Sequence, residues 1–254
     1  MLLNRLSLLR ERVSDWSEYP FNVPTIASLC NLEIQKPVVF FVGENGSGKS
    51  TLLEAIAIHY GFGGEDGNRN FSSATTDSVH TVEPLAMALR VAFSRRTGRG
   101  FFLRAESFFN TATAIDALGT ADAYGGRSLH AQSHGESFIA LAASRFNREG
   151  LYLIDEPEAA LSAQRQLSLL VILHDLIKHH REVQVIIATH SPILLGYPDA
   201  KILSFDGGEI HEIEYTETPP YQLYSRFLAD PQRYLNLMFE DEPCYVMTAN
   251  DALG

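Results

Sequence analysis

The sequence has little that would tie the chain to a membrane, to a disulfide framework or to a broad basic surface. Its 254 residues include two cysteines, Cys30 and Cys244, which lie far apart in the sequence and lack metal-ligand spacing. We therefore expect a reduced, cytoplasmic setting. No apolar run approaches the ~20 residues that span a bilayer. The N-terminal segment is interrupted by charge and lacks a signal-peptide cleavage site, so we expect mature sequence there. The net charge of −11 argues against broad, nonspecific binding of nucleic acid.

The composition is that of a globular protein with a full core, at 45% apolar and 20% charged residues. We expect a single α/β domain over residues 1–254. Within it, we expect a mostly parallel core sheet, an antiparallel β lobe from the N-terminal region and residues 85–104, and a small helical lobe at about 107–148. An amphipathic C-terminal extension is expected over about 216–254.

The most informative feature is an apolar stretch, 38–42, that runs into the pattern G-x-x-x-x-G-K-S at 43–50 and then into helix-forming residues. Glycines let the backbone wrap around an anion, and successive N–H groups make a nest for phosphate oxygens. Lys49 can reach the β- and γ-phosphates, and the Ser50 hydroxyl can bind Mg²⁺. The helix dipole points its positive end at the same phosphates. The residues expected to bind a nucleoside triphosphate are Gly43, Glu44, Asn45, Gly46, Ser47, Gly48, Lys49, Ser50 and Thr51.

Two further strands are expected to end beside this loop. The apolar stretch 151–154 leads into Asp155 and Glu156, which places both carboxylates at the carboxyl edge of a parallel sheet, where α/β proteins bind ligands. There Asp155 can hold Mg²⁺ through water, and Glu156 can polarise the water that attacks the γ-phosphate. His190 follows the next apolar strand, 183–189, where it can sense the γ-phosphate.

Taken in order, these motifs resemble the ABC-type ATPases, a family of P-loop NTPases. The stretch Ser133-His134-Gly135-Glu136 resembles the S-x-G-E form of the family's signature, and 160–162 resembles its D-loop. The chain departs from the transporter form: His134 replaces a glycine, and Glu136 replaces a glutamine. The match to the glutamine loop is the weakest, because Glu106 would have to replace the glutamine.

The resemblance implies ATP hydrolysis with Mg²⁺ in a head-to-tail homodimer that sandwiches two ATP molecules. In this arrangement Lys49, Glu156 and His190 act on the phosphates from one protomer, and the signature meets the nucleotide of the other. The implied metal ligands are Ser50, Asp155 and Glu106, and the implied signature contacts are Ser133, Gly135 and Glu136. About 26 residues separate Glu106 from Ser133, too few for the long coiled coil of chromosome-tethering relatives.

Several patterns have a simpler structural interpretation. Ser133-x-x-Glu136 is also a capping box, which stabilises the start of a helix. Two apolar runs, 85–93 and 101–103, predict a hairpin over 85–104, and its arginine-rich part, 90–104, is expected to be solvated with its aromatics in the core. The histidines of 174–180 are expected to lie at a solvated helix end. Tyr19 and Phe21 are candidates for adenine stacking, although aromatic residues next to prolines usually pack at an edge.

We therefore expect an ATPase whose ATP-dependent dimerisation drives a partner. The leading hypothesis is a stand-alone ATPase of repair or defence type, acting on a protein or nucleic-acid partner. The alternative is the nucleotide-binding subunit of a membrane transporter with a permease as partner. The S-x-G-E signature and the missing transporter-type glutamine loop favour the first. The partner and the role of the C-terminal extension are not specified by the sequence.

Overall fold

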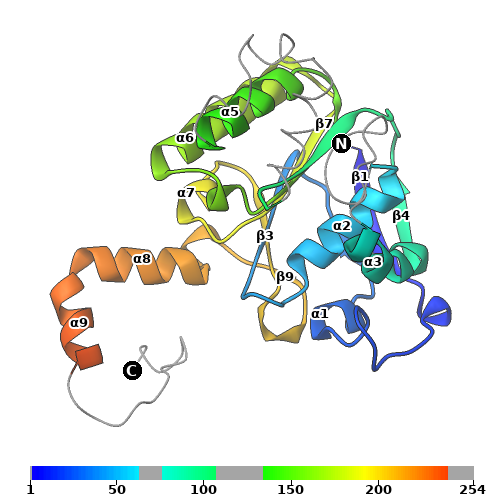
Figure 1. Cartoon of the computed structure of the whole chain (residues 1–254), viewed down its shortest axis with the longest axis horizontal. Coiled ribbons are helices and arrows are strands. Elements are labelled where there is room, and N and C mark those ends of the chain that lie inside the picture. The colour runs from blue at the N-terminus through cyan, green and yellow to red at the C-terminus, as the bar shows by residue number, and fades with distance from the viewer. Residues whose placement is uncertain (1, 63–75, 107–133, 240–254) are drawn as a thin grey trace.

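The strands of the described residues form two β-sheets (Figure 1). We describe a computed structural model, which covers residues 2–62, 76–106 and 134–239. The larger sheet contains, in spatial order, β5 (Gly100–Arg104), β6 (Gly150–Asp155), β7 (Val183–Ala188), β3 (Val38–Val42), β8 (Lys201–Ser204) and β9 (His211–Glu212). Its neighbouring strands are parallel except for the β8–β9 pair. The smaller sheet is antiparallel, in the order β2 (Leu32–Glu33), β1 (Leu3–Leu8) and β4 (Leu89–Phe93).

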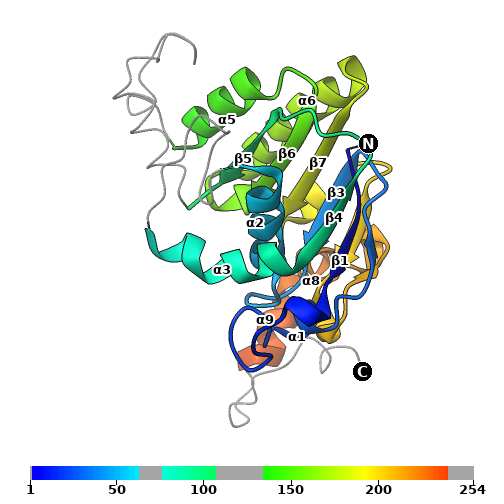
Figure 2. The ribbon, with the colours of Figure 1, turned by 90° about the vertical axis from the view of Figure 1, so that its right-hand side faces the viewer.

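Helices cover both faces of the larger sheet (Figure 2). The described α-helices are α1 (Pro24–Ala27), α2 (Lys49–Tyr60), α3 (Thr76–Ala88), α5 (His134–Arg145), α6 (Ala163–His179), α7 (Pro192–Leu195), α8 (Pro219–Ala229) and α9 (Pro231–Phe239). Short 3₁₀ turns occupy Arg10–Arg12, Pro157–Ala159, Asp206–Gly208 and Tyr215–Glu217. The expected α/β class, with a mostly parallel sheet and a separate antiparallel sheet, is confirmed.

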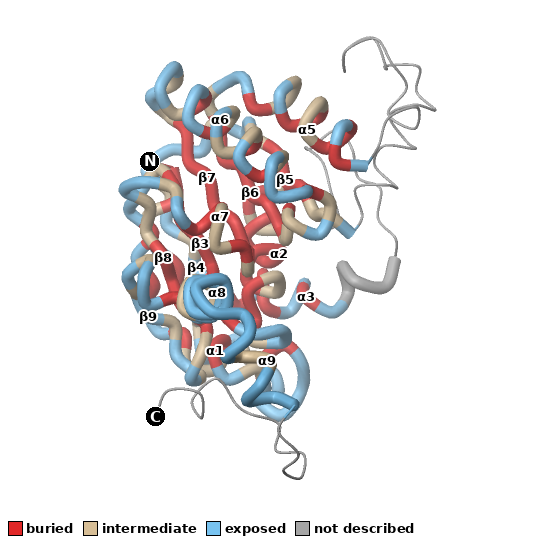
Figure 3. The backbone as a smooth tube through the Cα atoms, turned by 90° about the vertical axis from the view of Figure 1, so that its left-hand side faces the viewer, coloured by how far each residue is buried: buried red, intermediate tan, exposed pale blue. Residues whose placement is uncertain are grey.

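Alternation along the strands divides the interior into two cores. On β3, Val39 and Phe41 pack with α2, α3 and the smaller sheet. The intervening Val38, Phe40 and Val42 pack with α5, α6 and α7 on the opposite face. All five side chains are buried, as expected for a parallel strand covered on both faces (Figure 3). The central strand that leads into the phosphate loop is therefore fixed from both sides.

The expectation of a hairpin over 85–104 was wrong. Helix α3 continues through Pro84 to Ala88, and β4 then pairs antiparallel with β1. Strand β5 belongs to the other sheet, where it pairs in parallel with β6. A short apolar run does not by itself distinguish a buried helix from a strand, and packing against α2 decides the conformation of this one. The aromatic residues Phe101 and Phe102 are buried, as expected.

The described part of the expected C-terminal extension contains two helices, α8 and α9, separated at Asp230, and residues 240–254 of it lie outside the described residues. Neither helix contains a buried residue, and both extend away from the body of the protein (Figures 1 and 3). Together they expose Leu223, Tyr224, Phe227, Leu228, Leu237, Met238 and Phe239. Across residues 2–62, 76–106 and 134–239, no helix combines the length and apolar character needed to cross a bilayer.

A single buried amide joins the N-terminal region to the larger sheet. Gln184 on β7 is fully buried. Its Oε1 accepts hydrogen bonds from the backbone N–H groups of Leu2 and Leu3 at 3.1 and 2.6 Å. Its Nε2 donates to the carbonyl oxygens of Leu3, Ile34 and Lys36 at 2.9–3.1 Å. Because the hydrogen bonds to Leu2, Leu3 and Ile34 are buried, Gln184 satisfies backbone polar groups that would otherwise be buried without these partners.

We therefore expect Gln184→Leu to destabilise the protein severely. The apolar side chain preserves most of the volume but leaves several buried backbone groups unpaired, at about 1–3 kcal/mol each. Thermal or chemical unfolding of the variant would measure the loss, with the exposed Gln164→Leu on α6 as a matched control. A Gln184→Leu protein as stable as the control would contradict this role.

Candidate functional site

The predicted phosphate loop lies between β3 and α2, at the carboxyl end of the larger sheet. Three of its glycines have positive φ angles: 148° at Gly43, 80° at Gly46 and 99° at Gly48. Other residues rarely adopt these conformations, which explains why the loop requires glycine at these positions. Gly48 immediately precedes the first turn of α2, so the helix N-terminus faces the concave side of the loop.

Lys49 is the buried cation of this loop. Its side chain curls back, and Nζ donates to the carbonyl oxygens of Gly43 at 2.6 Å and Glu44 at 2.9 Å. Burial lowers the pKa of Lys49, although the carboxylates of Glu156 and Asp155 oppose that effect. No carboxylate among the residues described by the structure forms an ion pair with it. The ammonium group of Lys49 is therefore bound by backbone carbonyl oxygens, and it has no directly paired carboxylate in the described part of the chain.

Ser50 and Asp155 connect the loop to the acidic strand. Ser50 Oγ donates to Asp155 Oδ1 at 2.9 Å. The other oxygen, Oδ2, accepts a hydrogen bond at 3.0 Å from Nε of Arg104, at the end of β5. Burial raises the pKa of Asp155, opposed by the guanidinium of Arg104 and the hydrogen bond from Ser50. Two predicted metal ligands thus meet directly, together with an arginine to which the sequence assigned no role at this site.

Glu156 and His190 also come together, as predicted from their places after β6 and β7. Their Oε1 and Nε2 atoms are 3.5 Å apart. Glu156 has a φ of 47°, unusual for a residue with a side chain, at the turn that ends β6. Contact with His190 lowers the pKa of Glu156, and Lys49 contributes to the same effect against partial burial. Glu156 is therefore held as a carboxylate at the position expected for polarising water.

A second glutamate fixes the position of His190. Glu158 Oε1 accepts hydrogen bonds from Thr189 Oγ1 at 2.8 Å and from the backbone N–H of His190. Burial raises the pKa of Glu158, opposed by these hydrogen bonds. The sequence placed Glu158 beside the acidic pair but did not indicate this contact, because 31 and 32 positions separate the partners.

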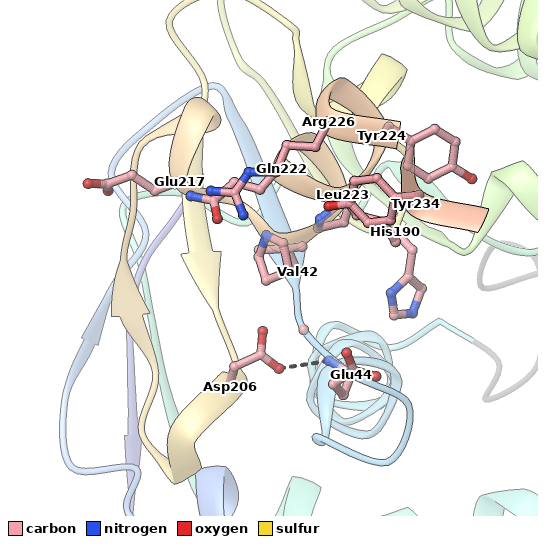
Figure 4. A pocket seen from close by; sticks show the side chains of 13 residues that line it. Val42, Glu44, His190, Asp206, Glu217, Gln222, Leu223, Tyr224, Arg226 and Tyr234 are labelled. Carbon is pink, nitrogen blue, oxygen red and sulfur yellow. Dashed lines mark hydrogen bonds between the residues drawn. The ribbon is translucent and has the colours of Figure 1, made fainter. Parts of the chain in front are cut away.

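The hairpin between β8 and β9 supports the other end of the phosphate loop. Asp206 Oδ1 accepts a hydrogen bond from the backbone N–H of Glu44 at 2.8 Å (Figure 4). Both residues line a cavity of about 510 Å³ that also includes His190 and the first turns of α8. Tyr224 and Tyr234 approach this cavity from α8 and α9 (Figure 4). The sequence did not indicate this contact between the hairpin and the loop.

A second cavity, of about 430 Å³, lies on the side of the loop where the predicted metal ligands Ser50 and Asp155 are. It is lined by Tyr19, Asn45, Gly46, Ser50, Thr51, Glu54, Thr81, Val82, Arg104, Glu106, Asp155 and Glu156. The hydroxyl of Tyr19 is 2.9 Å from Thr51 Oγ1, whereas Phe21 is buried in the core. Of the two aromatic candidates, only Tyr19 therefore lines this cavity, and its stacking on adenine stays a prediction. Glu106 is exposed at the cavity wall, and its predicted metal contact stays a prediction.

The predicted signature is described only in part. Ser133 lies outside the described residues, so the capping box and its nucleotide contact stay predictions. Gly135 is buried where a side chain would come within 2.7 Å of Arg165 on α6 and 3.0 Å of the Ala160 carbonyl. Glu136 Oε1 accepts a hydrogen bond from Arg165 at 2.9 Å. The start of α5 is therefore packed against the predicted D-loop of the same chain.

The described residues fit a bound nucleotide and Mg²⁺. Lys49 is a buried cation that lacks a counter-ion, and Ser47 Oγ is buried without a hydrogen-bond partner among the described residues. Both features suit a loop that receives phosphate. The Ser50 hydroxyl and Asp155 carboxylate are hard oxygen ligands of the kind that Mg²⁺ prefers, and Mg²⁺ normally completes its coordination with water and substrate phosphates. The described part of the chain contains no group of three or more His, Cys, Asp or Glu residues that could hold a metal ion by themselves.

Comparison with known proteins agrees with this geometry. An AAA-domain family model matches residues 25–148, and a second AAA-domain model, whose description also names a type IV toxin–antitoxin system, matches residues 121–196. The aliphatic sulfonates import ATP-binding protein SsuB 3 of Nocardia farcinica is 30% identical over 200 residues, which cover 76% of this chain and 74% of that protein. The chain belongs to the ABC-type ATPases. Membership in this family makes it a nucleotide-binding protein and an ATPase.

Other similar proteins share lower identity with this ABC-type ATPase. SsuB 2 of Rhodococcus jostii is 25% identical over 201 residues, covering 78% of this chain and 80% of that protein. The SMC head domain from Thermotoga maritima superposes with a TM-score of 0.45 at 16% identity, covering 84% of this chain and all of that one. CbiO1 from Clostridium perfringens, part of the cbiONQ transporter complex, has a TM-score of 0.45 at 17% identity, covering 83% and 92% of the two chains.

Replacing the buried cation tests the phosphate site directly. We expect Lys49→Ala to reduce ATP affinity or turnover by about 100-fold or more, because phosphoryl transfer depends on electrostatic stabilisation of the phosphates. Titration with a fluorescent ATP analogue and a phosphate-release assay would measure both quantities. The exposed Lys178→Ala on α6 removes the same charge outside the site. Unchanged binding and hydrolysis in Lys49→Ala would reject the assignment.

Proposed function

We propose that this ABC-type ATPase works as a stand-alone head, in which ATP joins two protomers head to tail and hydrolysis releases them to drive a partner. The observation that supports this most is the convergence of Lys49, Ser50, Asp155, Glu156 and His190 at one edge of the sheet. These residues provide phosphate binding and water activation from one protomer. The partner's signature, Ser133, Gly135 and Glu136, would complete the site.

Each residue has a defined role in this proposal. Lys49 and the N–H groups of 43–51 bind the phosphates, while Ser50 and Asp155 would hold Mg²⁺. When bound, Mg²⁺ would neutralise phosphate oxygens. Glu156 accepts a hydrogen bond from the attacking water and orients it toward the γ-phosphorus, and the bond between that phosphorus and the ADP oxygen breaks. The products are ADP and inorganic phosphate.

His190 links the reaction to the rest of the protomer. It faces Glu156 through its ring and is fixed by Glu158 through its backbone. It also borders the cavity beneath α8. Loss of the γ-phosphate therefore changes the surroundings of a side chain that adjoins both the water-activating carboxylate of Glu156 and the C-terminal extension. If ATP binds the dimer more tightly than the monomer, it favours the dimer by that difference in affinity, and its hydrolysis removes this preference.

The second candidate function is the nucleotide-binding subunit of a membrane transporter. The two curated relatives favour it, since both are named import ATP-binding proteins. In this case the partner would be a permease on a separate chain. The S-x-G-E form of the signature and the absence of a glutamine at position 106 favour the stand-alone function. Purifying the protein in an ATP-trapped state with its partner would separate the two: a co-purifying permease would establish the transporter function.

The cycle predicts a specific behaviour for Glu156→Gln. The amide preserves size and hydrogen bonding but lacks the charge that polarises water, so ATP should bind and persist. We expect a monomer-to-dimer shift with ATP that is absent with ADP and stronger than in the wild type. Size-exclusion chromatography with light scattering would measure it.

The matched control is Glu209→Gln, an exposed residue of the β8–β9 hairpin, which should behave as the wild type. Normal hydrolysis by Glu156→Gln would show that this carboxylate does not activate water. A protein that stays monomeric at micromolar concentration with saturating ATP would reject the dimer cycle.

A further inference from the structure

Three hydrogen bonds and helix α2 link four side chains into a ring, on the side of the phosphate loop that carries Ser50. Ser50 Oγ donates to Asp155 Oδ1 at 2.9 Å, and Asp155 Oδ2 accepts from Arg104 Nε at 3.0 Å. Arg104 also donates through a terminal nitrogen to Glu54 Oε2 at 2.9 Å. Glu54 and Ser50 both lie on α2, which closes the ring. The guanidinium thus engages two carboxylates through different nitrogens.

Sheet register and helix periodicity bring these four residues together. In the parallel pairing of β5 with β6, Arg104 lies directly opposite Asp155, so the two side chains leave the same face of the sheet. Residues four apart on a helix share a face, which puts Glu54 one turn beyond Ser50 and toward the same strand ends. Backbone geometry therefore places Arg104 beside Asp155, and Glu54 beside Ser50. The guanidinium of Arg104 then reaches from Asp155 on the sheet to Glu54 on the helix.

The three charged side chains of the ring are largely buried, although all four side chains line the 430 Å³ cavity, so water screens their charges only partly. The side chain of Arg104 is 14% exposed, that of Glu54 5% and that of Asp155 4%. Removing the guanidinium would leave two largely buried carboxylates close together without the charge that Arg104 supplies to both, which is unfavourable. Fork-like guanidinium contacts also fix orientation, which a single ammonium cannot reproduce at two acceptors.

We propose that Arg104 is a positioning residue for Asp155. It holds Oδ2 so that Oδ1 faces Ser50, and its charge prevents Glu54 and Asp155 from capturing a divalent cation before the nucleotide arrives. The inference rests on the proposed function, because Asp155 matters to the reaction as a ligand of the Mg²⁺ that accompanies ATP. Arg104 itself contacts neither phosphate nor water in this role.

The alternative is an ion pair that only stabilises the fold. A purely structural arginine would change unfolding temperature when replaced, but would neither create a cation site nor alter turnover in a variant that remains folded. Divalent-cation binding without nucleotide is therefore the decisive readout, because it does not depend on hydrolysis.

The experiment compares the wild type with Arg104→Met, Arg104→Lys and a control, Arg95→Met. Arg95 is also paired with a glutamate, Glu182, at 2.8 Å, but it is exposed and remote from the loop. Each protein is heated with chelator and with MgCl₂ or MnCl₂ alone, and Mn²⁺ binding is measured by electron paramagnetic resonance. Steady-state ATP hydrolysis then gives kcat and KM separately.

We expect Mn²⁺ or Mg²⁺ alone to raise the unfolding temperature of Arg104→Met and to leave the wild type and Arg95→Met unchanged. Arg104→Lys retains the charge and should bind no free cation. In both Arg104 variants kcat should fall by at least about tenfold with a smaller change in KM for ATP, because Asp155 is misplaced while the phosphate loop is intact.

Two results would overturn the proposal: Arg104→Met that takes up no cation without nucleotide, or Arg104→Lys with wild-type kcat. If Arg104→Met fails to fold, kcat of Arg104→Lys decides. If the wild type hydrolyses no ATP, the proposed function fails, and cation uptake by Arg104→Met still decides the role of Arg104.

Discussion

The hydrogen bond from Ser50 to Asp155 is the contact on which the site depends. It joins residues 105 positions apart, one from the phosphate loop and one from the acidic strand. It forms only because β3, β7 and β6 run in parallel and end at the same edge, with β7 between the other two. The two cores on opposite faces of the sheet fix those strands, and Gln184 ties the N-terminal sheet to β7. Stability and chemistry therefore share one scaffold.

Much of the site can be predicted from the sequence because its residues lie in short contiguous segments. The loop at 43–50, the carboxylates after β6 and the histidine after β7 each follow an apolar strand, and a parallel sheet brings such strand ends together. The order of these segments also predicts the fold class. In each case a local pattern is sufficient, because the sheet supplies the long-range geometry automatically.

The contacts that the sequence did not reveal all join positions that are distant in the chain. Arg104 meets Asp155 because β5 pairs with β6, and the same region was mistaken for a hairpin. Glu158 reaches Thr189, and Asp206 reaches the N–H of Glu44, through loops whose conformations have no local signature. An apolar run such as 85–93 is compatible with a helix or a strand. Here it contains the last residues of helix α3 and all of strand β4.

The composite site is tested most directly by mixing two inactive variants. Lys49→Ala removes the phosphate site but keeps the signature, whereas Ser133→Arg blocks the signature but keeps the phosphate site. Neither homodimer contains a complete site, but a mixed dimer contains one, formed by Lys49 of one protomer and Ser133 of the other. Phosphate release by the mixture well above the sum of the two separate proteins is the predicted result. A mixture no more active than its components, or a Ser133→Arg protein with wild-type turnover, would contradict it.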